Sequence, residues 1–121
     1  MGKTALIVDD STSMRQMVGF TLRESGFTVL EGENGKDALG KLDGAAVQII
    51  ITDLNMPVMD GIAFIKEVRA RSAHRFTPIL MLTTESQDAS KQAGKAAGAT
   101  GWLVKPFDPE RLMQVVQKVL P

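Results

Sequence analysis

Polar side chains that could bind a metal ion or a phosphate follow four short apolar segments of the sequence. Asp9 and Asp10 follow the segment TALIV, and Asp53 follows VQIIIT. Thr83 closes the segment ILMLT, and Lys105 follows GWLV. If these segments are parallel strands of one sheet, their carboxyl ends lie along the same edge. Three carboxylates, a hydroxyl and an ammonium group would then line one crevice.

Each of these residues has an ordinary structural interpretation when it is taken alone. An acidic pair after a strand is commonly part of a solvated loop. Asp53 could cap a helix, Thr83 could be a satisfied hydroxyl at a strand end, and Lys105 could be a surface lysine. Their joint occurrence at matching strand ends favours a functional site.

The oxygen-rich composition of this predicted site favours Mg²⁺. Three ionised carboxylates in one crevice repel one another, and a cation is needed to keep all three ionised. Oxygen ligands suit a hard ion, and Mg²⁺ is usually held by few protein ligands together with water and phosphate. We do not expect zinc, because the sequence has no cysteine and a single histidine. That histidine, His74, is expected to be solvated in the loop before ILMLT.

Phosphoryl transfer onto Asp53 is the chemistry that these groups favour. A carboxylate is ionised at neutral pH and can attack phosphorus without a general base. The transfer needs in-line placement and charge neutralisation, which a divalent ion and one lysine can supply. No glycine-rich loop follows any of the apolar segments, so we do not expect a nucleotide to be the direct donor.

Short apolar segments alternate five times with segments of helical period. The expected strands cover residues 4–8, 27–31, 47–52, 79–83 and 101–104. The expected helices are residues 11–25, one capped by Asn34, one from the loop 53–61 to Arg71, residues 86–97, and one capped by Asp108.

The apolar pattern also predicts how these elements lie. The polar second strand indicates a sheet edge, and the third strand, apolar on both faces, a central position. Five strand–helix units predict an α/β fold with a parallel sheet between two helix layers. The expected inward residues of the first helix are Met14, Met17, Val18, Thr21 and Leu22, and those of the fourth are Ala89, Ala93, Ala96 and Ala97.

Length and composition predict one globular domain that spans residues 1–121. Lys and Arg number 14, as do Asp and Glu, so no net charge points to nucleic acid or a membrane as partner. There is no cysteine, and we expect neither a signal peptide nor a membrane span. The expectation is a monomeric, cytoplasmic protein.

Four motifs give the chain a resemblance to the response-regulator receiver family, and within it to the single-domain chemotaxis type (CheY-like). DDS follows the first strand, DLNMPVMDG begins at Asp53, LTTE closes the fourth strand and LVKPF spans the end of the fifth. The resemblance covers residues 3–120. It implies a flavodoxin-like fold, a doubly wound five-stranded parallel sheet in the order 2-1-3-4-5 with five helices.

By position, the resemblance implies roles for the acidic residues and their neighbours. Asp53 resembles the phosphoacceptor, Asp10 the direct Mg²⁺ ligand, and Asp9 a residue that acts chiefly through metal-bound water. The backbone carbonyl of Asn55 would complete the metal site. Asn55 and Glu85 fall at the two positions that tune self-dephosphorylation in the family.

Four further residues resemble the groups that sense the phosphoryl group. Thr83 resembles the hydroxyl that bonds the phosphoryl oxygen, and Lys105 the lysine that pairs with it. Trp102 falls where the family has an aromatic residue that swings inward on activation. Tyr or Phe is more usual there, and a plain core tryptophan is the alternative. Pro106 resembles a proline held in a cis bond.

The resemblance implies a response regulator of two-component signal transduction, a phosphoacceptor with at most slow self-dephosphorylation rather than an enzyme. The implied donor is the phosphohistidine of a sensor histidine kinase (CheA-like). The implied effector is the flagellar motor switch or a phosphatase, bound through the face formed by the fourth helix, fifth strand and fifth helix.

Two other functions stay open from the sequence. One is a phosphate sink or relay receiver without motor output. The other is a hydrolase that forms an aspartyl-phosphate, but such enzymes usually have a second carboxylate two residues after the nucleophile, where this chain has Asn55.

Overall fold

Strands and helices alternate along the whole chain in the computed structural model, which describes residues 3–84, 88–105 and 107–120, without the side chains of residues 83 and 88–90. The elements are β1 (Thr4–Val8), α1 (Thr12–Glu24), β2 (Thr28–Gly32), α2 (Gly35–Leu42), β3 (Ile49–Thr52), α3 (Gly61–Arg69), the 3-10 helix η1 (Ser72–His74), β4 (Ile79–Thr83), α4 (Asp88–Ala97), β5 (Gly101–Val104) and α5 (Pro109–Val119). The predicted alternation is confirmed. The third helix is shorter than predicted, because the chain turns into η1 after Arg69.

The strands form one parallel sheet in the order β2-β1-β3-β4-β5. This is the flavodoxin-like order that the resemblance implies, so the prediction is confirmed. β3 lies at the centre and all four of its residues are buried, whereas β2 lies at an edge and is more exposed. In such a sheet the strand order reverses beside β1 and β3, which places the ends of these two strands at the switch point.

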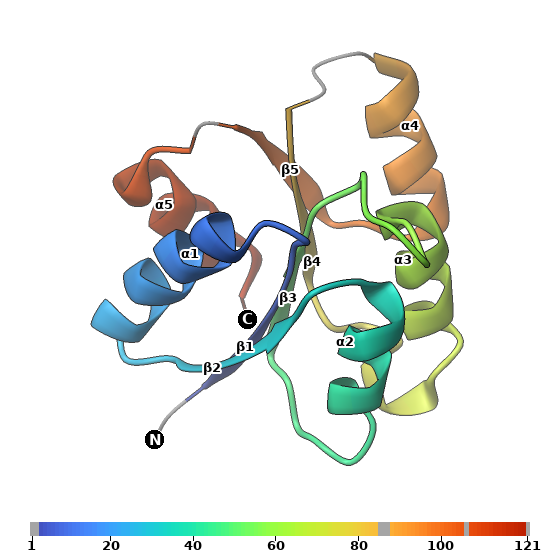
Figure 1. Cartoon of the computed structure of the whole chain (residues 1–121), viewed down its shortest axis with the longest axis horizontal. Coiled ribbons are helices and arrows are strands. Elements are labelled where there is room, and N and C mark those ends of the chain that lie inside the picture. Colours follow the sequence, from blue (N-terminus) through green and yellow to red (C-terminus); the bar gives the residue numbers. More distant parts are fainter. Residues whose placement is uncertain (1–2, 85–87, 106, 121) are drawn as a thin grey trace.

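Helices cover both faces of the sheet, with α1 and α5 on one face and α2, α3 and α4 on the other (Figure 1). Successive side chains of a strand point to opposite faces. Accordingly, Ile7 and Ile51 pack toward α1 and α5, while Leu6 and Ile50 pack toward the other three helices. The sheet is thus buried on both faces, and the polar groups lie in the loops at the ends of the strands. Among the described residues, no helix has the length and apolar character needed to cross a membrane.

Side-chain caps start several of the helices that follow a strand. The oxygen of each capping residue accepts a backbone N–H of the first turn, which satisfies a donor that the helix leaves free. The residues are Ser11, Asn34, Asp60 and Asp108. The predicted caps at Asn34 and Asp108 are confirmed, and Pro109 occupies the first helical position after the latter.

The predicted inward face of α4 is wrong at Ala93 and Ala96, and the side chain of Ala89 lies outside the described part of the chain. Ala97 is buried, but Ala93 and Ala96 are exposed, and Gly94 faces the sheet instead. A Cβ added at Gly94 would lie 2.0 Å from Sδ of Met81. The bulk of Met81 therefore requires the glycine side of the helix, and this contact sets the rotation of α4.

Two smaller predictions also fail. Met17 is 53% exposed, because α1 buries Val18 and Leu22 and turns Met17 outward. His74 is buried rather than solvated, because it lies in η1, whose turn carries it against the body of the protein.

Candidate functional site

The ends of β1, β3 and β5 bring together three charged residues that lie far apart in the sequence. Lys105 Nζ lies 2.9 Å from Asp9 Oδ2 and 3.2 Å from Asp53 Oδ2. The three side chains are at most 11% exposed. The parallel sheet therefore places one ammonium group between two nearly buried carboxylates.

A third carboxylate completes an acidic cluster. Asp9, Asp10 and Asp53 each offer one oxygen, and these oxygens lie within 4.8 Å of one another. Asp9 and Asp53 are held on both sides: each Oδ1 accepts a backbone N–H, from Ser11 at 2.9 Å and from Leu54 at 2.7 Å, and each Oδ2 faces the ammonium group. Asp10 is exposed and accepts no hydrogen bond within the described part of the chain. Three carboxylates with no nitrogen or sulfur donor fit a hard divalent cation such as Mg²⁺.

The backbone around Asp53 is fixed by two close contacts. Its N–H donates to the Val8 carbonyl at 2.8 Å, and the N–H of Gly61 donates to the Leu54 carbonyl at 2.9 Å. A Cβ at Gly61 would lie only 2.2 Å from the carbonyl oxygen of Asp53. The first residue of α3 therefore packs directly on the Asp53 peptide, and only glycine fits there.

The loop between Asp53 and α3 contains a strained turn. Val58 has φ +69°, and the N–H of Met59 donates to the Pro57 carbonyl at 2.7 Å. A positive φ with a hydrogen bond between residues i and i+2 is the pattern of a classic γ-turn, which is rare and strained. A β-branched residue in this region is unusual, so neighbouring contacts must hold the loop in this shape. Nothing in the sequence pattern predicts this feature.

The electrostatics of the cluster reflect an excess of negative charge. Burial, together with the charge of Asp9, raises the pKa of Asp53 above its ordinary value, although Lys105 acts to lower it. Burial acts to lower the pKa of Lys105, but the hydrogen bond to Asp9 and the charges of Asp53 and Asp9 outweigh it, so the pKa is raised. One lysine does not balance three carboxylates, and a divalent cation would relieve the remaining repulsion.

The raised pKa of Asp53 predicts a stabilising substitution. A raised pKa means that the folded protein binds the proton more tightly than the unfolded chain, so ionised Asp53 reduces stability at neutral pH. With metal chelated, Asp53→Asn should raise the unfolding temperature at pH 7. The gain should shrink as the pH falls through the folded pKa toward the unfolded value of about 3.9. Thermal unfolding followed by circular dichroism at several pH values measures this.

Asp43 provides a control of opposite sign. Its hydrogen bond with Arg71 lowers its pKa, so ionised Asp43 adds stability that is lost as the pH falls through the folded pKa. Asp43→Asn should therefore lower the unfolding temperature at pH 7. An Asp53→Asn variant that is less stable than the wild type under these conditions would contradict this account of the site.

The other residues predicted for the site are placed only in part. Thr83 ends β4 and pairs with Val104, one residue before Lys105, but its side chain is outside the described part. Asn55 is exposed in the loop after Asp53. Glu85 and Pro106 lie outside the described residues, so their predicted roles stay predictions.

Trp102 lies on the edge strand β5 and is 40% exposed, so it is not a core residue. Its indole is covered instead by a lysine of α4, since Lys91 Nζ lies 4.8 Å from the ring centroid. A cation over an indole face is attracted by the ring. The contact with Lys91 thus stabilises the ring in an outward position.

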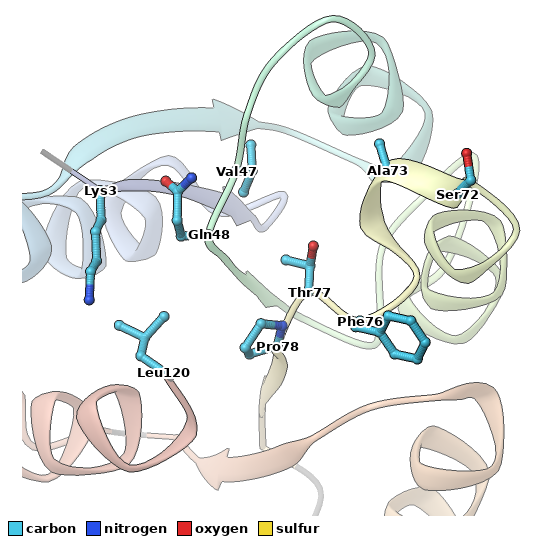
Figure 2. A pocket seen from close by; sticks show the side chains of 9 residues that line it. All are labelled: Lys3, Val47, Gln48, Ser72, Ala73, Phe76, Thr77, Pro78 and Leu120. Carbon is cyan, nitrogen blue, oxygen red and sulfur yellow. The ribbon is translucent and has the colours of Figure 1, made fainter.

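A separate pocket lies at the opposite side of the molecule, at the amino-terminal ends of the strands (Figure 2). It has a volume of about 340 Å³, and Lys3, Phe76 and Leu120 are among the residues that line it. None of its lining residues is acidic. The pocket therefore lacks the oxygen donors of the acidic cluster.

Comparison with known proteins gives a consistent assignment. The family model "Response regulator receiver domain" matches residues 5–117. Chemotaxis protein CheY1 of Helicobacter pylori is 42% identical over 117 residues, covering 95% of this chain and 94% of the relative. The CheY homolog of Campylobacter jejuni is 40% identical over 117 residues, covering 95% and 90%. The structure of the chemotaxis response regulator CheY4 of Vibrio cholerae superimposes with a TM-score of 0.95 at 53% identity, covering 99% of this chain and all of that one.

These similarities extend over nearly the full chain. The acidic triad is the kind of site at which receiver domains hold Mg²⁺, and these domains are phosphoacceptors rather than enzymes. The chain therefore belongs to the response regulator receiver domain family and is a homologue of the CheY-type chemotaxis proteins.

Proposed function

We propose that this chain accepts a phosphoryl group on Asp53 from a phosphohistidine of a sensor histidine kinase and thereby changes its affinity for a downstream target. The observation that carries this proposal is the buried Asp53 carboxylate, which faces Lys105 beside the acidic pair Asp9 and Asp10. Membership of the receiver family supports a histidine kinase as the donor.

In the proposed reaction an oxygen of the Asp53 carboxylate attacks phosphorus, and the phosphorus–nitrogen bond of the donor histidine breaks. The histidine nitrogen leaves with the bonding electron pair. Leu54 N–H and the Lys105 ammonium group already bond the two carboxylate oxygens and hold the carboxylate in place. Lys105 then lies next to the new phosphoryl charge and stabilises it through a charge-assisted hydrogen bond.

The acidic residues would hold Mg²⁺ in this account. Asp10 and Asp53 would bind it directly, Asp9 chiefly through water, and Asn55 through its backbone carbonyl. Bound Mg²⁺ would neutralise charge on the transferring phosphoryl oxygens. The chain itself holds the carboxylates of Asp9 and Asp53 in place by hydrogen bonds, while Asp10 has no hydrogen-bond partner in the described part of the structure.

The proposed switch runs through Thr83 and Trp102. A hydroxyl at the end of β4 that moves toward the phosphoryl oxygens would leave space beside the strand. Trp102 pairs with Met81 of β4, so its ring lies on the strand next to this space. Inward rotation would remove the indole from Lys91 and from solvent.

Emission of Trp102 tests this switch, because the chain has one tryptophan and no tyrosine. We expect beryllofluoride with Mg²⁺ to reduce acrylamide quenching of the indole and to shift its emission to the blue. The change should be incomplete, because full conversion from 1:99 to 99:1 requires about 5.5 kcal/mol of differential binding. A neutral quencher is chosen because Lys91 would concentrate iodide at the ring.

The Asp53→Asn variant is the control, and it should show no response to beryllofluoride. The contrary result is quenching of the wild type that stays the same with beryllofluoride and with acetyl phosphate, although the mass shows that acetyl phosphate has phosphorylated the protein. In that case Trp102 is a fixed residue and the switch uses other groups.

The proposed setting is chemotaxis in the cytoplasm, with the chain acting as a single domain over residues 1–121. The relatives named above are chemotaxis proteins, which favours this output. The proposed target is the flagellar motor switch or a phosphatase. The face formed by α4, β5 and α5 is available for it, since Ala93, Ala96 and Trp102 are exposed there.

A further inference from the structure

Arg15 of α1 joins the loop after β1 to the edge strand β2. Its side chain is only 14% exposed. Nη1 donates to the backbone carbonyl of Asp9 at 2.6 Å, and Nε donates to Glu31 Oε1 at 3.3 Å. A longer contact of 3.4 Å runs from Nη2 to Thr12 Oγ1. The guanidinium group is therefore fixed at the start of the acidic site and is not a freely moving surface charge.

The Asp9 carbonyl is the last polar group of that residue to be engaged. The N–H of Asp9 donates to the Gly32 carbonyl at 3.1 Å, and the two carboxylate oxygens accept from Ser11 and Lys105. Arg15 bonds the remaining group, the carbonyl. This carbonyl belongs to the peptide bond that joins Asp9 to Asp10, so the contact sets the plane of that peptide.

Asp10 depends on this peptide more than its neighbours do. Its side chain is exposed and accepts no hydrogen bond within the part of the chain that the structure describes. The backbone that carries Asp10 therefore sets the position from which its carboxylate extends. We propose that Arg15 is a positioning residue of the metal site, which orients Asp10 through the Asp9–Asp10 peptide. This inference rests on the proposed function of Asp9, Asp10 and Asp53 as the Mg²⁺ site.

Charge and orientation make opposite predictions for removal of Arg15. A guanidinium group near three carboxylates repels a divalent cation, so its loss by charge alone would tighten metal binding. Loss of the contact that orients Asp10 would weaken metal binding. Glu31 reduces the charge effect, because it pairs with Arg15 and with Arg23. We therefore expect orientation to dominate.

The test is the affinity of the metal-free protein for Mn²⁺, a probe with the same preference for oxygen ligands. Free Mn²⁺ is measured by its electron paramagnetic resonance signal during titration. We expect Arg15→Met to weaken binding about tenfold, as is typical when a group that orients a ligand is removed. Arg15→Lys keeps the charge but loses the forked guanidinium group that reaches both Asp9 and Glu31. Its Mn²⁺ affinity should lie between those of the wild type and Arg15→Met.

Arg23→Met is the matched control. Arg23 lies on the same helix and pairs with the same glutamate, at 3.3 Å, but makes no hydrogen bond to Asp9 within the described part of the chain. Its pair is exposed, and its loss should change Mn²⁺ affinity less than about twofold. An equal loss in both methionine variants would overturn the inference, because it would trace the effect to Glu31 or to helix α1.

Binding by Arg15→Met that equals or exceeds that of the wild type would also overturn it. Asp10→Ala separates this failure from failure of the proposed site. If Asp10→Ala weakens binding and Arg15→Met does not, only the role of Arg15 is wrong. If neither does, the metal site itself is wrong. Thermal unfolding in chelator verifies that each variant is folded. If Arg15→Met does not fold, Arg15→Lys is used in its place. A Mn²⁺ affinity of Arg15→Lys equal to that of the wild type would then reject the inference.

Discussion

In the Asp53→Asn variant, phosphoryl uptake from acetyl phosphate is expected to fall below detection, whereas the wild type should gain one phosphoryl mass with Mg²⁺ and none with chelator. The amide lacks the charge of the carboxylate and is a much poorer nucleophile. The substitution is nearly isosteric, and it removes a carboxylate whose pKa is raised by burial, so the folded state should not be destabilised. Loss of the fold would therefore not explain the loss of uptake. Intact-mass spectrometry over a time course measures the uptake.

Asp60→Asn is the matched control for this prediction. Asp60 lies in the same loop and caps α3, with Oδ1 accepting the Ala63 N–H at 2.8 Å. Asparagine caps a helix as well as aspartate does. This variant should therefore keep the uptake of the wild type. An undiminished mass gain in Asp53→Asn, without a new phosphoryl group on a neighbouring hydroxyl, would refute the assignment.

Gly61→Ala has the second large expected effect, a loss of about 3 kcal/mol in the free energy of unfolding, at the upper end for overpacking. The new Cβ would lie 2.2 Å from the Asp53 carbonyl oxygen and 2.8 Å from Leu54 Cα. Both are backbone atoms and cannot rotate away, so α3 or the end of β3 must move. The same movement displaces the Asp53 carboxylate, and we expect slower phosphoryl uptake as well. Urea unfolding in chelator measures the stability.

Gly40→Ala is the corresponding control for a glycine within a helix. Gly40 is exposed in α2, and a Cβ there would meet no atom within 4 Å. Alanine should raise the free energy of unfolding by about 0.5–1 kcal/mol, because it has less backbone freedom to lose on folding. A Gly61→Ala variant as stable as the wild type would contradict the close packing of α3 on Asp53.

The main features of the fold follow from local pattern, and so they could be predicted from the sequence. Buried strands are short apolar segments, and caps such as Asn34 and Asp108 mark helix starts through their own backbone contacts. The rotation of α4 is different, because it depends on contact between Gly94 and Met81, which lies on another element. Periodicity within α4 carries no information about that partner.

The candidate site shows the same division. Asp9, Asp53 and Lys105 were recognisable as polar groups at strand ends, and parallel strand order then brings them together. Arg15 carried no such signal. A charged residue on a helix is usually solvated, and its bond to the Asp9 carbonyl depends on the tertiary fold. The strained turn at Val58 is likewise a product of its surroundings.

The central claim is that Asp53 carries the phosphoryl group, and locating that group in the wild-type protein tests it most directly. Borohydride reduces an aspartyl phosphate to homoserine, which survives proteolysis and is identified by tandem mass spectrometry. Trypsin separates the candidates, since Asp53 lies in the peptide of residues 42–66 and the acidic pair in that of residues 4–15. The account predicts homoserine at position 53 after incubation with acetyl phosphate and Mg²⁺. Homoserine at Asp9 or Asp10, with position 53 unmodified, would contradict it.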